Sequence, residues 1–105
     1  MTAIASVYVT FADAAEAERI GRAVIEERLA ACVNILGSCR SIYRWHGEIE
    51  TADEVAVIFK TGLAQAPLLA ERIRTLHSYE VPAVAVWPIA HVPADYSAWV
   101  IDQVL

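Results

Sequence analysis

Two long strand-forming segments joined by a two-residue turn constrain the fold of this chain more than any other feature of its sequence. The first covers residues 31–45, with a break at Gly37-Ser38, and the second covers residues 48–60, with a polar break at residues 51–53. The pair His46-Gly47 between them predicts a tight turn, because glycine readily adopts positive φ. Strands usually have about five or six residues, so we expect a hairpin that is long for a protein of this size.

Strand and helix patterns alternate on both sides of this hairpin. Alternating apolar residues predict a strand over residues 3–11, and a nearly continuous apolar run predicts another over residues 83–89. Apolar residues at helical spacing predict a helix from Asp13 to about Arg28, a second over residues 64–76, and a short terminal helix capped by Asp95. The order β-α-β-β-α-β predicts an α/β (α+β) protein of the ferredoxin-like class, with a long hairpin and a C-terminal helix, in a single domain of residues 1–105.

Two details of this prediction concern burial. Glu16 stands three residues after Asp13, which is the spacing of a capping box, and we expect its side chain to face water with the other charged residues of the helix. Because residues 83–89 are almost all apolar, we expect this strand to lie at the centre of the sheet, buried on both faces.

The charge of the chain argues against two classes of partner. The formal net charge is −5 and the arginines are scattered, so no basic patch is present to neutralise nucleic-acid phosphates or to bind an anionic membrane surface. The apolar runs are shorter than the roughly 20 residues that a membrane-spanning helix needs. The first residues lack the positive charge of a signal peptide. We therefore expect a cytoplasmic protein with no nucleic-acid partner and no membrane insertion.

An excess of apolar residues points to a partner subunit. Hydrophobic residues make up 57% of the chain, whereas soluble domains usually contain about 45–50%. A protruding hairpin also has unpaired strand edges, which are an aggregation hazard unless another chain covers them. Both features favour self-association.

Sequence motifs for metal binding and for nucleophilic catalysis are missing. Cys32 and Cys39 do not form a CxxC pair, and we expect two reduced thiols. The sequence contains no HxxxH and no GxSxG motif. We therefore expect no enzymatic activity and no organic cofactor.

The end of the predicted hairpin combines aromatic and acidic residues. Tyr43 and Trp45 share a strand face beside Glu48 and Glu50. Large aromatic side chains near an exposed hairpin end need a surface to pack against. This cluster forms either a subunit interface or a ligand pocket.

Two further clusters lie in the second half of the chain. His77 and Glu80 stand three residues apart in a predicted loop, where they could coordinate a divalent cation, support acid–base chemistry, or form a hydrogen-bonded turn. Tyr96 and Trp99 share one side of the terminal helix, where they pack on the sheet or on a neighbouring subunit. Lys60 ends an apolar strand and needs a carboxylate partner if it is buried.

These clusters belong to a pattern that covers nearly the whole chain and resembles the CutA family of divalent-cation tolerance proteins. The matching residues are 28–34, Ser41-Ile42-Tyr43, Trp45, Gly47, Ile49-Glu50, Glu54, Lys60-Thr61, His77, Tyr79-Glu80, Pro82, Tyr96 and Trp99. The resemblance implies a ferredoxin-like homotrimer in which long hairpins pair between subunits. It also implies an architecture similar to that of the trimeric PII signalling proteins and an association with copper tolerance in bacteria.

Three functions are compatible with this pattern. The first is a homotrimeric divalent-cation tolerance protein that binds Cu(II) or another divalent cation, with Cys32, His77 and Glu80 as candidate ligands. The second is a PII-like signalling or interaction trimer with clefts between its subunits for a small ligand or a protein. The residues expected to line such a cleft are Tyr43, Trp45, Glu50, Lys60, Tyr79, Tyr96 and Trp99. The third is an unrecognised enzyme in which His77 acts as acid or base.

Overall fold

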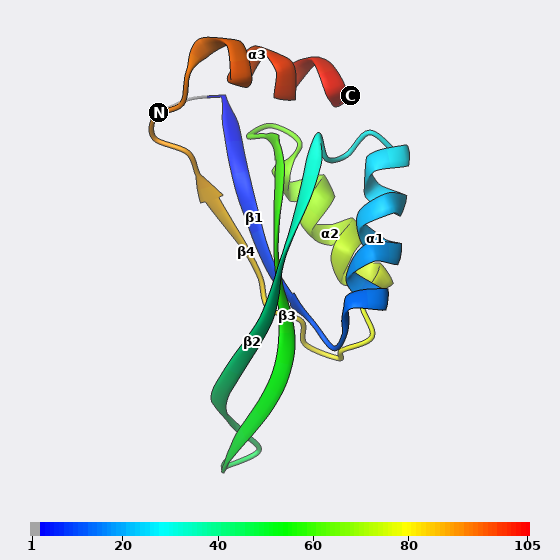
Figure 1. Cartoon of the computed structure of the whole chain (residues 1–105), viewed down its shortest axis with the longest axis vertical. Helices are drawn as coiled ribbons and strands as arrows, with labels where there is room; N and C mark the ends of the chain where they lie inside the picture. Colours follow the sequence, from blue (N-terminus) through cyan, green and yellow to red (C-terminus); the bar gives the residue numbers. More distant parts are fainter. Residues whose placement is uncertain (1–2) are drawn as a thin grey trace.

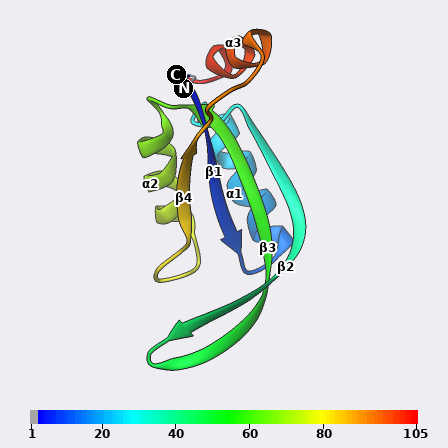
Figure 2. The same ribbon diagram turned by 90° about the vertical axis from the view of Figure 1, so that its left-hand side faces the viewer.

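The computed structural model describes residues 3–105 as a four-stranded antiparallel sheet with two helices packed on one side of it (Figure 1, Figure 2). In chain order the elements are β1 (Ile4–Phe11), α1 (Ala14–Glu26), β2 (Cys32–Trp45), β3 (Glu48–Gly62), α2 (Ala66–Leu76), β4 (Val84–Pro88) and α3 (Ala94–Gln103). The strands lie in the order β2-β3-β1-β4. These two orders are those of the ferredoxin-like fold, which confirms the predicted fold class. Within the described residues, no helix combines the length and the apolar character needed to cross a membrane.

Side chains on one face of the sheet form the core with α1 and α2. Because side chains alternate along a strand, Val7 and Val9 of β1 point to the same face as their partners Phe59 and Val57 of β3. All four side chains are fully buried. They pack with Phe11 and with the apolar residues of the two helices, Ile20, Val24, Leu69 and Ile73.

The two ends of α1 are set by local contacts. At its start, the Asp13 carboxylate accepts a hydrogen bond from the backbone N–H of Glu16 at 2.8 Å, which confirms the predicted cap. The helix ends at Glu26, earlier than predicted, because Arg28 adopts the left-handed conformation with φ of 60°. The Arg28 side chain donates to backbone carbonyls of α3, which lies across one end of the sheet (Figure 1).

The predicted hairpin is formed by β2 and β3, which extend beyond the helices as a curved arm (Figure 1, Figure 2). His46 and Gly47 both have positive φ, as a two-residue hairpin turn requires. Neither predicted break ends a strand. Next to Gly37, β2 has a bulge between Ile35 and Gly37, with φ of 111° at Gly37, and the strand then continues. β3 continues through residues 51–53, which pair with residues 40–42. Backbone pairing across the hairpin holds these residues extended, so their polar side chains do not end the strand.

Two predictions about the last elements are also wrong. β4 is an edge strand that pairs with β1, and Val86 and Trp87 are exposed, so it is not a central strand buried on both faces. The central positions belong to β1 and β3. The helices cover one face of the antiparallel sheet only, so they do not bury β4 on both faces. In α3 the capping position is Pro93, and Asp95 lies inside the first turn.

Candidate functional site

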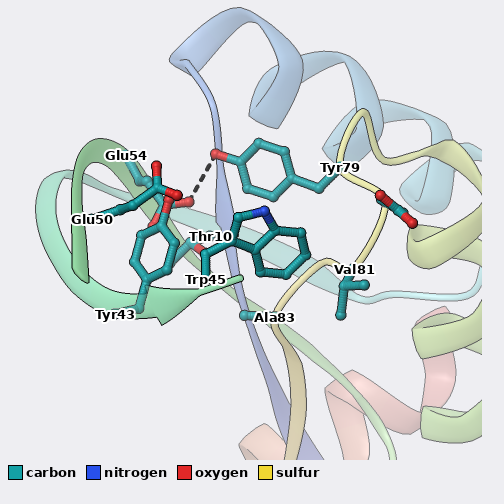
Figure 3. A pocket seen from close by; sticks show the side chains of 9 residues that line it. Thr10, Tyr43, Trp45, Glu50, Glu54, Tyr79, Val81 and Ala83 are labelled. Carbon is teal, nitrogen blue, oxygen red and sulfur yellow. Dashed lines mark hydrogen bonds between the residues drawn. The ribbon is translucent and has the colours of Figure 1, made fainter. Parts of the chain in front are cut away.

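A pocket with a volume of about 360 Å³ opens between the arm and the loop that follows α2 (Figure 3). The arm curves beneath this loop, so residues far apart in the sequence border one cavity (Figure 2). The residues that line it are Thr10 of β1, Tyr43, Trp45, Glu50 and Glu54 of the hairpin, and Tyr79, Glu80, Val81 and Ala83 of the loop. The pocket thus combines three aromatic rings with three carboxylates.

Strand alternation places the hairpin residues of the pocket on one face. Tyr43 lies opposite Glu50 in the hairpin register, and Trp45 follows two residues along the same face. This confirms that Tyr43 and Trp45 share a face with acidic residues. Glu54 lies four residues beyond Glu50 on that face, and its residue is only 9% exposed.

A hydrogen bond joins the loop to the hairpin across the pocket. The hydroxyl of Tyr79 donates to Oε2 of Glu54 at 2.8 Å (Figure 3). Burial raises the pKa of the Tyr79 phenol, and the hydrogen bond and negative charge of Glu54 raise it further. The phenol therefore stays protonated at neutral pH and remains the donor to the carboxylate.

Behind the pocket, the side chain of His77 is fully buried. Its Nε2 lies 2.8 Å from the carbonyl oxygen of Thr10, and its Nδ1 accepts a hydrogen bond from the backbone N–H of Tyr79 at 3.1 Å. The imidazole also stacks on Phe11, with ring centroids 4.8 Å apart. Both ring nitrogens are engaged, so His77 forms a hydrogen-bonded turn and offers no free lone pair to a metal ion or a substrate in this conformation.

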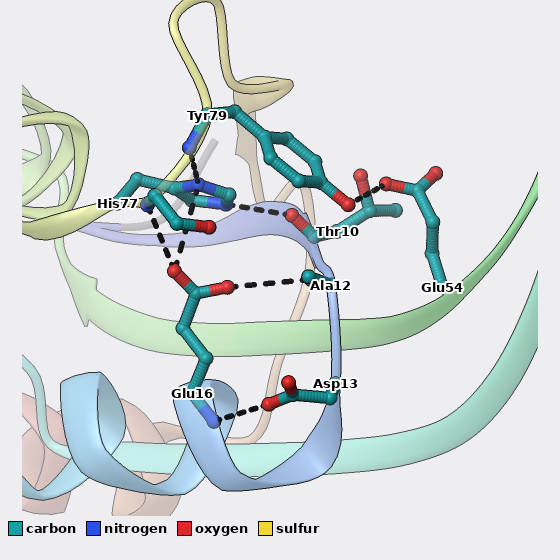
Figure 4. Close-up of polar contacts among 8 residues, drawn as sticks. Thr10, Ala12, Asp13, Glu16, Glu54, His77 and Tyr79 are labelled. Atoms are coloured by element: carbon teal, nitrogen blue, oxygen red, sulfur yellow. Dashed lines mark hydrogen bonds and ion pairs between the residues drawn. The ribbon is translucent and has the colours of Figure 1, made fainter.

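The carboxylate of Glu16 is buried beside His77, contrary to the prediction that it faces water. It accepts hydrogen bonds from the backbone N–H groups of Ser78 at 2.8 Å and Ala12 at 3.3 Å, and it lies 4.0 Å from Nδ1 of His77 (Figure 4). Burial by itself raises the pKa of Glu16. The hydrogen bonds from Ser78 and Ala12 outweigh burial, and the pKa lies below its usual value. An ionised Glu16 therefore connects the start of α1 to the loop.

A second cluster lies at the other end of the sheet, beside α3. Cys32 pairs with Lys60 in the sheet, and its Sγ lies 3.6 Å from the hydroxyl of Tyr96, whose ring stacks on Trp99. Burial, together with the hydrogen bond and charge of Cys32, raises the pKa of Tyr96 to about 12. Lys60 is half-buried, and its Nζ lies 3.5 Å from Oδ1 of Asn34, an amide oxygen in place of the expected carboxylate.

The three predicted metal ligands are not brought together within one chain. Cys32 is aligned with Ser6 of β1 through Lys60, whereas His77 contacts Thr10, which lies four residues further along β1. Four residues of strand correspond to about 13 Å. Over residues 3–105, no group of three or more His, Cys, Asp or Glu side chains is placed to hold a metal ion.

The predicted ligand cleft divides into two groups. Lys60, Tyr96 and Trp99 lie in the cluster beside α3. The others line the pocket, together with Glu80 from the predicted metal set: Tyr43, Trp45, Glu50 and Tyr79. Glu54 and Thr10 also line the pocket, and neither is among the cleft residues predicted from the sequence. The even spacing between Glu50 and Glu54 could have placed both on one face, but their contact with the loop depends on the tertiary structure.

Comparisons with known proteins identify a family. The model of the family described as CutA1 divalent ion tolerance protein matches residues 5–103. A divalent-cation tolerance protein CutA from Thermus thermophilus is 42% identical over 93 residues, which cover 89% of this chain and 90% of that protein. Other relatives are longer, and the chain spans 55% of the mouse Protein CutA.

Two solved structures are similar over nearly their whole length. The crystal structure of CutA from Xylella fastidiosa superposes with a TM-score of 0.95 at 31% identity, covering 98% of this chain and 99% of that one. The structure named periplasmic divalent cation tolerance protein CutA, from Archaeoglobus fulgidus, has a TM-score of 0.91 at 33% identity, covering 95% of this chain and 97% of that one.

Proposed function

Because the chain belongs to the CutA1 family of divalent ion tolerance proteins, we propose that it is a homotrimer that binds Cu(II) or another divalent cation. The main support for the trimer is the exposed apolar surface of the arm formed by β2 and β3. Ile42 and Ile49 are neighbours on the arm face opposite to the pocket, and they are 72% and 68% exposed. Burying one such side chain between subunits contributes about 1.5–3 kcal/mol.

A second uncovered surface supports the same assembly. On the sheet face opposite to the helices, Trp87 of β4 stacks on Tyr8 of β1 with ring centroids 5.0 Å apart, and Trp87 remains exposed. β2 and β4 are the edge strands of the sheet. A closed ring of identical subunits would cover both the exposed sheet face and the unpaired strand edges, because each subunit contacts the next and no end stays open.

The three predicted cation ligands differ in how accessible their side-chain atoms are to a metal ion. Glu80 is exposed and lines the pocket with Glu50 and Glu54, so its oxygens are accessible to a cation. Cys32 would combine with ligands from another chain. His77 would have to give up one of its two hydrogen bonds before it could bind a metal. We therefore place the first cation contact at Glu80.

Sedimentation equilibrium of the untagged full chain tests the assembly. At micromolar concentration we expect about three times the chain mass of 11.5 kDa. A stable, folded monomer would refute the proposed trimer.

A calorimetric titration with Cu(II) tests the cation contact. We expect Glu80→Gln to weaken binding, whereas Glu26→Gln, an exposed acid of α1 outside the pocket, leaves it unchanged. Equal binding by all three proteins would remove Glu80 from the proposal. An untagged chain is essential, because a histidine tag binds copper itself.

The pocket itself favours a second candidate function, the binding of a small organic ligand. Its volume of about 360 Å³ lies at the lower end of the range of small-molecule sites, about 300–1,000 Å³. The PII-like function predicted from the sequence needs a cleft with aromatic walls, and Tyr43, Trp45 and Tyr79 line this pocket.

We also propose that the chain acts by binding and not by catalysis, in the cytoplasm. The histidine considered as acid or base has both nitrogens engaged in structural hydrogen bonds. Both cysteines are free, as is usual in a reducing compartment. A relative is named periplasmic, so cell fractionation of the native organism is the test of location, and recovery in the periplasm would refute this part of the proposal.

A further inference from the structure

The aromatic rings of Tyr43, Trp45 and Tyr79 and the carboxylates of Glu50 and Glu54 line the same cavity, and we propose that this cavity binds a small organic ammonium ion (Figure 3). The inference rests on the second candidate function, because it names the class of ligand for the pocket. It does not depend on copper binding.

The walls of the pocket match an organic cation. The face of an aromatic ring carries partial negative charge and attracts cations, most strongly for tryptophan, and cages of such rings recognise methylated ammonium groups. Tyr43 and Trp45 come from β2, and Tyr79 comes from the opposite side of the pocket (Figure 3). Val81 and Ala83 add apolar wall that suits methyl and methylene groups.

The charge of the pocket is negative and is not balanced by a cationic side chain of the described residues. Neither Lys nor Arg is among the residues that line the pocket. In residues 3–105 the ion pairs involve other carboxylates, those of Glu16, Glu18, Glu27, Asp53 and Glu71. Glu54 is nine-tenths buried and receives a neutral phenol hydrogen bond from Tyr79. A buried carboxylate is costly without a compensating charge, and a bound ammonium ion supplies that charge.

A metal ion bound at Glu80 alone would leave most of this cavity unfilled. Divalent ions take several oxygen, nitrogen or sulfur ligands at about 2.0–2.6 Å, and the described residues place no three such side chains close enough. The cavity is also about ten times the volume of one water molecule in the liquid. Organic cations use the aromatic walls directly, because an ammonium group with methyl substituents is weakly hydrated.

Calorimetric titration of the untagged full chain with choline chloride tests the proposal. The matched control ligand is 3,3-dimethyl-1-butanol (dimethylbutanol below), in which an uncharged tert-butyl group replaces the trimethylammonium group of choline. A sodium chloride titration controls for ionic strength. We expect saturable binding of choline with one site per chain, and binding of dimethylbutanol that is weaker on the order of tenfold.

Two variants locate the site. Trp45→Ala is expected to weaken choline binding on the order of tenfold. Trp99→Ala is the matched control, because Trp99 is similarly exposed, 45% against 38% for Trp45, and lies at the other end of the molecule. Glu54→Gln keeps an acceptor for Tyr79 and removes only the charge, so it should weaken choline binding and leave dimethylbutanol binding unchanged. Circular dichroism confirms that each variant is folded.

The possible outcomes separate the ligand class from the underlying function. If dimethylbutanol binds as tightly as choline, the pocket is a small-ligand site but the ammonium class is wrong. If neither ligand binds, the ammonium proposal is overturned, and the small-ligand function loses the support of both probes. An equal loss of choline binding in Trp45→Ala and Trp99→Ala would place binding elsewhere and overturn the assignment.

Discussion

The Nε2 atom of His77 lies 2.8 Å from the carbonyl oxygen of Thr10, a contact between the last residue before the loop and the end of β1 (Figure 4). Since the carbonyl oxygen of Thr10 can only accept a hydrogen bond, Nε2 carries the proton. Nδ1 then accepts the hydrogen bond from the backbone N–H of Tyr79. The side chain thereby fixes the backbone at the start of the loop and orients Tyr79 toward Glu54. The pocket therefore depends on a histidine that does not line it.

Replacement of His77 by alanine is expected to destabilise the protein by about 2–4 kcal/mol. The variant loses two hydrogen bonds and the stacking on Phe11, and it leaves a cavity in a fully enclosed site. Urea denaturation at a fixed protein concentration measures the effect. His91→Ala is the control, since His91 is exposed, and it should change stability by less than about 0.5 kcal/mol. Equal stability of the two variants would contradict the structural role of His77.

The stability of the protein at acid pH should depend on Glu16. Its pKa in the folded state lies below the usual 4.5, so its stabilising contribution is complete above the unfolded pKa and is lost as the pH falls through the folded pKa. The melting temperature of the wild type should therefore fall more steeply from about pH 5 to about pH 3 than the melting temperature of Glu16→Gln.

The exposed Glu26 on the same helix provides the control for this measurement. The Glu26→Gln variant should follow the wild-type acid profile. A Glu16→Gln profile parallel to that of the wild type would show that the buried carboxylate makes no such contribution.

The hydrogen bond between Tyr79 and Glu54 should appear as a coupling energy in a double-mutant cycle. Tyr79→Phe and Glu54→Ala each remove the same hydrogen bond, so their combined effect on the unfolding free energy should fall short of the sum by about 1–2 kcal/mol. Tyr96→Phe combined with Glu54→Ala should be additive, because Tyr96 lies in the cluster beside α3. Additivity in both pairs would mean that the bond across the pocket is energetically unimportant.

The exposed face of the arm should control assembly. Ile42→Asp with Ile49→Asp places two charges on a surface that we propose to be buried between subunits, so the chain should sediment as a monomer with an unchanged circular dichroism spectrum. Leu68→Asp makes the same kind of change on exposed α2 and should leave the assembly intact. An assembly that survives the double arm variant would exclude this face of the arm as the interface.

Local sequence signals predicted a large part of the fold. The tight turn at His46-Gly47, the cap at Asp13 and the alternation of Tyr43 and Trp45 depend on neighbouring residues and on strand or helix periodicity, and the structure has all three. The same signals failed where backbone pairing overrides side-chain polarity. Residues 51–53 look like a break in the sequence, yet they continue β3 because a partner strand satisfies their backbone groups.

The sequence by itself determined the order of the elements, the long hairpin and the family, because helix and strand periods and a residue pattern are properties of the chain read along its length. Only the tertiary structure decided that β4 is an edge strand, that Glu16 is buried and that His77 is fully hydrogen-bonded. It also separated Cys32 from His77 and brought Glu54 against Tyr79. Each of these depends on which segments meet in space, and the burial and hydrogen-bond partners of a polar side chain are set by residues that are distant in the sequence.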